Sequence, residues 1–292
     1  MDIASVADIS LLGDDEIAQY RRHGYVVLRR LLGPRHVAAC TAALADLAGG
    51  RIPLTQTQLM FEAGTDAASS PADRELRIRK YMDFCDDAPA LRDAAMSRRL
   101  HGVLDQLLGR GRTLFQEMAR VKPPRIGSEK PWHQDASYFR LTDPSLIAGV
   151  WIALDPALPT NGCMELVAGS HLDGPVAHVH ENDFNRCRIT PAETRARERL
   201  AIEMQPGDAL LFHSLLHHFT APNKSDLRRR AIQFHYHQHG AVWGTLDQHR
   251  RLYHDADGRY AGCTLPHAEL ADANYVHREG LPREIATVDT AS

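Results

Sequence analysis

The sequence predicts a mainly β protein in which helices come first and a double-sheet β core follows. Two features of the chain support this prediction. Before Gly111, runs with helical spacing end at glycines, as helices commonly do. After Gly111, short β-branched and aromatic runs alternate with Gly, Pro, Asn and Asp turns, a pattern typical of a sandwich or barrel. The 292 residues are enough for one domain of this kind.

The first part of the chain is expected to hold three helices. They are predicted at residues 12–23, 34–47 and 91–108, with acidic residues or Gly-Pro at their starts or glycine at their ends. Extended runs are expected at residues 25–28 and 77–84. The polar stretch from Leu54 to Asp73 has no clear periodicity, and we expect a loop long enough to close over a site.

The second part is expected to hold the strands of the core. They are predicted at residues 113–121, 148–154, 163–167, 200–204, 209–212 and 230–236. The polar stretch from Gly244 onward predicts loops and short helices. We therefore expect a single domain over residues 1–292. Its parts are a mostly helical portion at 1–110, the core at 111–240 and a C-terminal extension at 241–292.

Net charge, apolar runs and the counts of cysteine and histidine indicate which classes of function to expect. A formal net charge of −3 gives no reason to expect nucleic acid as a partner. No apolar run approaches the length of a membrane span, and the acidic N-terminus does not resemble a signal peptide. The five cysteines are dispersed without a CxxC pair, which favours reduced thiols in a cytoplasmic protein. Seventeen histidines raise the expectation of a metal site.

The stretch Trp132-His-Gln-Asp135 is the strongest candidate for that site. In an extended segment His133 and Asp135 point to the same side, so both can bind one ion. Two histidines and one carboxylate on one face of an iron ion, with open positions opposite, form the site of non-haem Fe(II) oxygenases. A second His-x-Asp pair, at His171 and Asp173, lies among turn residues. We interpret His171 as a loop residue that bonds to backbone.

A second histidine ligand is expected from the stretch His213-Ser-Leu-Leu-His-His218. In a strand, His217 and His218 must point to opposite faces, so only one of them can face the interior. His213 lies near them, and a structural role is expected for it. The residues alone leave the choice of ligand open.

The arginine run 228–230 is expected to place one side chain inward. Alternation along a strand gives an inward Arg229 between two outward arginines. A buried guanidinium is costly without an anion, and its planar fork matches a carboxylate. By the same parity, Gln233 and His235 share the inward face.

An ordered series of motifs runs through more than half of the chain, from about residue 79 to 237. The series comprises Lys122-Pro-Pro, Trp132-His-Gln-Asp, Asp143-Pro-Ser-Leu-Ile-Ala-Gly-Val-Trp151, Asn161-Gly-Cys, Gly169-Ser-His, Gly207-Asp and the segment from His218 through Asn223-Lys224 to Arg229. In this order the motifs resemble those of the phytanoyl-CoA hydroxylase family of iron- and 2-oxoglutarate-dependent oxygenases. The resemblance implies a double-stranded β-helix core, also called a jelly roll or cupin-like fold, with flanking helices.

The resemblance also implies roles for individual residues. His133, Asp135 and His218 would bind Fe(II), and Arg229 would bind the co-substrate 2-oxoglutarate. Further contacts to 2-oxoglutarate are implied for Lys80, Met118, Gln134, Trp151 and Thr220. The implied reaction uses O2, hydroxylates a C–H bond of a small molecule and releases succinate and CO2.

The resemblance assigns no role to Gln233 and His235. We expect them either to orient the substrate or to form a polar network in the core. The expected partner is a small molecule (an acyl-CoA, an amino acid or a natural-product intermediate), bound by a monomer or homodimer. Two other classes stay open: a 2-oxoglutarate sensor without turnover, and a redox-inert metalloenzyme with the same triad.

Overall fold

Two antiparallel β-sheets form the centre of the computed structural model, which describes residues 11–65, 70–180, 187–189, 197–263 and 286–288. The larger sheet has the order β1-β11-β6-β13-β4-β3-β2, with β14 paired to β4. Its strands are β1 (Tyr25–Leu28), β2 (Gln58–Phe61), β3 (Ile78–Met82), β4 (Arg112–Lys122), β6 (Ile147–Ala153), β11 (Ala209–His213), β13 (Arg229–Gln238) and β14 (Ala286–Val288).

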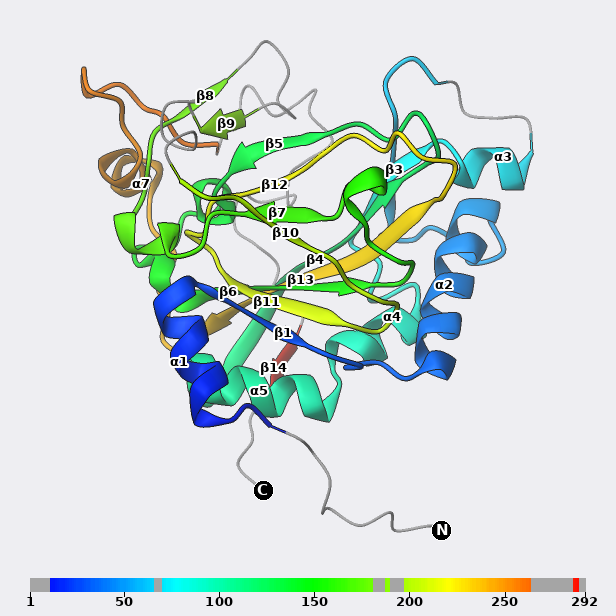
Figure 1. Ribbon diagram of the computed structural model, residues 1–292, viewed down its shortest axis with the longest axis horizontal. Coiled ribbons are helices and arrows are strands. Elements are labelled where there is room, and N and C mark those ends of the chain that lie inside the picture. The colour runs from blue at the N-terminus through cyan, green and yellow to red at the C-terminus, as the bar shows by residue number, and fades with distance from the viewer. Residues whose placement is uncertain (1–10, 66–69, 181–186, 190–196, 264–285, 289–292) are drawn as a thin grey trace.

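The smaller sheet lies over the larger one as a second layer (Figure 1). Its order is β10-β7-β12-β5, and a hairpin of β8 and β9 lies beyond β5. The strands are β5 (Lys130–His133), β7 (Met164–Leu166), β8 (His178–His180), β9 (Cys187–Ile189), β10 (Leu200–Ile202) and β12 (His218–Thr220). Two stacked antiparallel sheets confirm the predicted jelly-roll core.

Helices cover the outer face of the larger sheet (Figure 1). They are α1 (Asp14–His23), α2 (Pro34–Gly49), α4 (Pro89–Ala95) and α5 (Arg98–Leu108). The short helix α3 (Pro71–Glu75) lies beside α2, and α7 (Leu246–Leu252) follows the core. Leu44 of α2 and Leu100 of α5 are fully buried in one hydrophobic cluster with Phe234 of β13. Alternation along β13 therefore sends Phe234 toward the helices and its neighbours Gln233 and His235 toward the smaller sheet.

The structure corrects three expectations about secondary structure. The helix predicted at 91–108 is two helices, because the Ala95 carbonyl that ends α4 accepts hydrogen bonds from the Tyr236 hydroxyl at 2.7 Å and the His101 ring at 2.9 Å. The stretch predicted as a loop at 54–73 contains β2, which pairs with β3, and the start of α3. The C-terminal extension, predicted without strands, adds β14 to the sheet.

The prediction that all cysteines are reduced is wrong for two of them. Cys187 of β9 and Cys263, which follows α7, form a disulfide with Cα atoms 5.8 Å apart. Because 76 residues separate the two cysteines, local cysteine spacing could not predict the pair. Cys40, Cys85 and Cys163 are free and buried. Among the described residues no helix is long and apolar enough to cross a membrane.

Loss of this disulfide is expected to destabilise the fold. Cys263→Ser should lower the free energy of unfolding by about 2–4 kcal/mol, because the crosslink closes a long loop in the unfolded chain. Chemical denaturation of wild type and variant, each with and without dithiothreitol, provides the measurement. Reductant should lower the midpoint of the wild type and leave that of the variant unchanged. Equal midpoints for reduced and oxidised wild type would contradict this expectation.

Candidate metal centre

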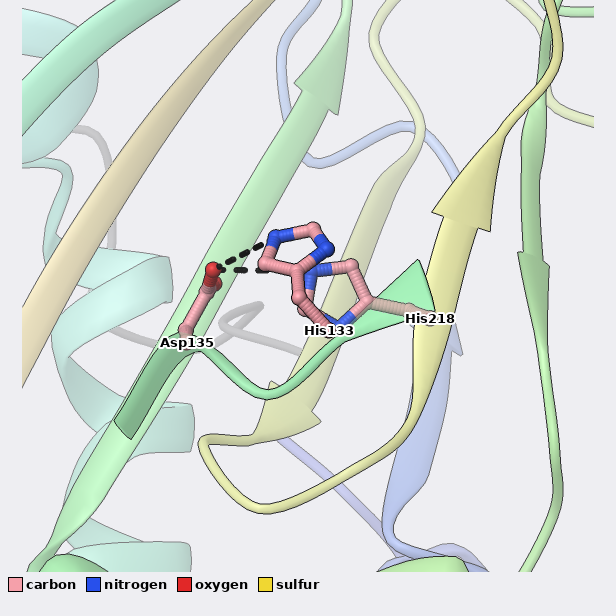
Figure 2. Close-up of side chains that lie close together, drawn as sticks. All are labelled: His133, Asp135 and His218. Atoms are coloured by element: carbon pink, nitrogen blue, oxygen red, sulfur yellow. Dashed lines mark ion pairs between the residues drawn. The ribbon is translucent and has the colours of Figure 1, made fainter. Parts of the chain in front are cut away.

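Strand pairing brings the two candidate histidine ligands together. In the antiparallel pair of β12 and β5, His218 lies directly opposite His133, and their ring centroids are 4.1 Å apart. The Asp135 Oδ1 atom lies 3.2 Å from His133 Nε2 and 3.5 Å from His218 Nε2. One ligand atom from each residue lies within 4.8 Å of the others, and Figure 2 shows the three side chains converging.

Asp135 reaches this position by a turn. The sequence predicted an extended segment through Asp135, but β5 ends at His133 and a 3₁₀ turn spans Asp135–Tyr138. Two hydrogen bonds favour the turn. The Ser137 hydroxyl donates to the Gln134 carbonyl at 2.7 Å, and the Ala136 amide donates to the Ser214 carbonyl at 3.0 Å. The turn directs the carboxylate back toward the imidazoles.

Backbone carbonyls fix which nitrogen of each imidazole faces the site. His133 Nδ1 lies 2.7 Å from the Pro131 carbonyl, and His218 Nδ1 lies 2.9 Å from the Leu216 carbonyl. A carbonyl only accepts, so each Nδ1 carries a proton and each Nε2 presents its lone pair to the site. This is how metal-binding histidines are commonly held.

Burial and neighbouring charges set the pKa values of the same groups in a way that favours binding of a cation. His133, Asp135 and His218 are each at most 5% exposed. Burial, followed by the nearby His218, holds the pKa of His133 well below its usual range, so the ring is neutral near pH 7. Burial alone would raise the pKa of Asp135, but the imidazoles of His218 and His235 outweigh it and hold that pKa low. Two imidazoles and a carboxylate form a donor set that suits Fe(II).

The other candidate histidines lie outside this group. His217, the neighbour of His218, is buried on the opposite side of the strand, and neither of its ring nitrogens has a partner among the described residues. His213 Nδ1 accepts from the Leu215 amide at 3.1 Å. The His171 ring bonds to the Arg21 carbonyl at 3.1 Å, as expected for a loop histidine.

A strongly cationic cavity contains three of the residues implied for 2-oxoglutarate. Arg229, Lys80 and Thr220 line it, together with one acid, Glu129. Its other charged or polar lining residues are Arg79, Arg120, Lys122, Ser128, Lys130 and Tyr138. Burial and the neighbouring Arg120 hold the pKa of Lys80 well below its usual range. A lining with so many cations favours an anionic ligand.

Arg229 is one of the buried cations of this cavity, with Lys80 and Lys122. It is 1% exposed, and its Nε and Nη1 atoms have no hydrogen-bond partner among the described residues. Burial lowers its pKa to about 9. Its guanidinium carbon lies 5.2 Å from the centroid of the Trp151 ring. The flanking arginines differ, because Arg228 pairs with Glu75 at 2.5 Å and Arg230 pairs with Asp155 at 2.8 Å.

Met118, Trp151 and Gln134 occupy different positions relative to the cavity. Met118 of β4 and Trp151 of β6 lie on either side of Gln233 in the sheet register, and both are buried. The Gln134 amide is bound to backbone at both ends: its nitrogen donates to the Gly174 and Leu215 carbonyls, each at 2.8 Å, and its oxygen accepts from the Val176 amide at 3.0 Å. Gln134 therefore ties the loops around the triad together.

Sequence reasoning missed two groups beside the triad. The Lys130 ammonium donates to the Tyr138 hydroxyl at 2.6 Å, and the Tyr138 ring lies edge-on to His133 at 6.0 Å. His178 of β8 accepts a hydrogen bond through its Nε2 atom from the Gln134 backbone N–H at 3.0 Å. Neither contact leaves a local sequence signal, since each depends on a turn or a distant hairpin.

A family model described as Phytanoyl-CoA dioxygenase (PhyH) matches residues 20–231. The chain belongs to this family. A probable phytanoyl-CoA dioxygenase from Caenorhabditis elegans is 26% identical over 78% of this chain and 76% of the relative. Phytanoyl-CoA dioxygenase 1 from Oryza sativa subsp. japonica is 29% identical over 77% of this chain and 88% of the relative. The predicted family resemblance is confirmed.

Solved structures share the fold. The α-ketoglutarate-dependent carbocyclase SnoK from nogalamycin biosynthesis has a TM-score of 0.63 at 21% identity, covering 90% of this chain and 97% of its own. EctD from S. alaskensis with bound Fe has a TM-score of 0.63 at 20% identity, covering 80% and 79%. Membership in the PhyH family, together with the buried triad, identifies a non-haem iron- and 2-oxoglutarate-dependent oxygenase.

Removal of any triad side chain is expected to prevent iron binding. His133→Ala, Asp135→Ala and His218→Ala should each abolish anaerobic Fe(II) binding and the weak visible charge-transfer band with 2-oxoglutarate, because two remaining ligands hold the ion poorly. Anaerobic titration followed by absorption provides the measurement. His217→Ala is the matched control, since it removes a buried imidazole one residue away. Loss of the band in His217→Ala but not in His218→Ala would reverse the assignment.

Proposed function

We propose that this PhyH-family protein hydroxylates an unactivated C–H bond of a small molecule. The reaction consumes 2-oxoglutarate and O2 and releases succinate and CO2. The observation that carries the proposal is the buried triad in a fold that also buries an uncompensated arginine, Arg229, in a cationic cavity. A metal site alone would not need that arginine.

The electrostatics of Arg229 support a dicarboxylate co-substrate. The Arg229 guanidinium is 1% exposed, and two of its nitrogens have no partner among the described residues. Burying such a charge destabilises the fold unless an anion pairs with it. Its planar fork would hold the distal carboxylate of 2-oxoglutarate through two parallel hydrogen bonds. Thr220 and Lys80 line the same cavity and would add a hydroxyl and a second cation.

Each group then has a distinct task. His133, Asp135 and His218 would hold Fe(II), which supplies the oxidative decarboxylation of 2-oxoglutarate and the oxygen transfer to the substrate. Trp151 would pack against Arg229 and fix the plane of the guanidinium. Met118, buried beside Gln233, would form part of the apolar wall. Gln134 would keep the loops around the metal in place through its three backbone contacts.

The substrate classes we propose are acyl-CoA thioesters, amino acids and natural-product intermediates. The first is supported by relatives named phytanoyl-CoA dioxygenases, and the others by fold neighbours crystallised with nogalamycin RO or with 5-hydroxyectoine. A panel drawn from these classes, followed by succinate release and a product mass increase of one oxygen, tests turnover. Tight 2-oxoglutarate binding without succinate from any member would instead favour a sensor.

Arg229 is expected to control affinity for the co-substrate rather than for the metal. Arg229→Ala should weaken 2-oxoglutarate binding by more than about tenfold, on the order of 2–5 kcal/mol, because a buried bidentate ion pair is lost. Calorimetric titration of the anaerobic Fe(II) protein with 2-oxoglutarate provides the measurement, and Fe(II) affinity should stay unchanged.

Arg228→Ala is the matched control for this experiment. Arg228 lies next in sequence but pairs with Glu75 and does not line the cavity, so its loss should change 2-oxoglutarate affinity by no more than about twofold. Equal losses in both variants would mean that the arginine run acts as a general basic patch, and the assignment of Arg229 would fail.

A further inference from the structure

Two side chains of β13 bind the oxygen of Asp135 that faces away from the histidine ligands. His235 Nε2 lies 2.8 Å from Asp135 Oδ2, and the Gln233 amide nitrogen donates to the same atom at 3.0 Å. Because both donors converge on one oxygen, their nitrogens are 3.3 Å apart. Oδ1 of the same carboxylate faces His133 and His218.

We propose that Gln233 and His235 are positioning residues that hold Oδ2 of Asp135, so that the carboxylate offers only Oδ1 to the metal. The proposal rests on the metal site of the proposed function. It differs from the expectation of substrate contact, because His235 Nε2 is directed at Asp135. A carboxylate restricted to one oxygen leaves a coordination position for co-substrate or O2 that a chelating carboxylate would occupy.

Among the described residues the His235 ring has no polar contact besides Asp135 and Gln233. The side chain is fully buried, and its Nδ1 has no hydrogen-bond partner among the described residues. Aromatic rings of Phe139, Phe115 and Phe212 surround it, with centroids 5.0, 6.1 and 6.5 Å away. An ionised carboxylate accepts but does not donate, so Nε2 carries the proton. In this apolar cage the charge-assisted hydrogen bond is strong and directional.

Gln233 is fixed by the sheet rather than by aromatic rings. Its backbone lies between Met118 of β4 and Trp151 of β6 in the sheet register, and its side chain is 4% exposed. The rigid strand thus directs a second donor at Oδ2 from a position two residues before His235. Two donors from one strand fix both the distance and the rotation of the carboxylate, which one donor cannot do.

The test compares variants that remove a donor at constant size. His235→Phe keeps an aromatic ring in the cage and Gln233→Met keeps a linear side chain, but neither can donate to Oδ2. The matched control is His237→Phe, because His237 is buried on the same face of β13 beside Phe115 and makes no contact with Asp135. His235→Gln restores a donor and serves as the conservative variant.

Two readouts are independent of turnover: the dissociation constant for Co(II), measured anaerobically by visible absorption, and the melting temperature of the metal-free protein. His235→Phe and Gln233→Met should each weaken Co(II) binding by about tenfold or more and change the shape of the Co(II) bands, as loss of a hydrogen bond to a metal ligand does. His235→Gln should recover most of the affinity. His237→Phe should stay within about twofold of wild type.

Unchanged or tighter Co(II) binding in His235→Phe and Gln233→Met would overturn the proposal, and so would an equal loss in His237→Phe. In either case, Co(II) binding by the wild type would still support the metal site of the proposed function. Failure of the wild type to bind Co(II) or Fe(II) would instead overturn the proposed function together with this inference. If His235→Phe does not fold, Gln233→Met with its normal melting temperature decides the outcome.

Discussion

The antiparallel pairing of β12 with β5 is the constraint on which the site depends. It places His218 opposite His133, and a shift by one residue would turn one of the two rings to the other face of the sheet. The turn at Asp135–Tyr138 then has only to bring one carboxylate to a pair of rings that the sheet has already positioned. The larger sheet packs against α2 and α5 through a common hydrophobic cluster and faces the smaller sheet that carries the two histidines.

Strand β13 connects the two halves of the site. Its inward face carries Arg229 at one end, in the cationic cavity, and His235 further along, against Asp135. The spacing between Arg229 and the triad is therefore fixed by one strand, paired on both sides with β4 and β6. A co-substrate with an anionic group at each end matches such a separation.

Local sequence rules predicted the parts of this site that depend on local geometry. Alternation placed Arg229 inward between Arg228 and Arg230, and the structure pairs the outer two with acids while burying the middle one. Alternation also separated His217 from His218. The rules did not predict contacts between segments that lie far apart in the sequence. The backbone contacts of Gln134, the bond from His235 to Asp135 and the Cys187–Cys263 disulfide join residues 40 to 100 positions apart.

We propose that one Fe(II) and one 2-oxoglutarate bind together between the triad and Arg229. Anomalous diffraction at the iron edge from anaerobic crystals grown with both ligands tests it most directly. We expect one iron peak bonded to His133 Nε2, Asp135 Oδ1 and His218 Nε2, with the far carboxylate of 2-oxoglutarate on the Arg229 guanidinium. An iron peak elsewhere, or a co-substrate carboxylate that does not contact Arg229, would contradict it.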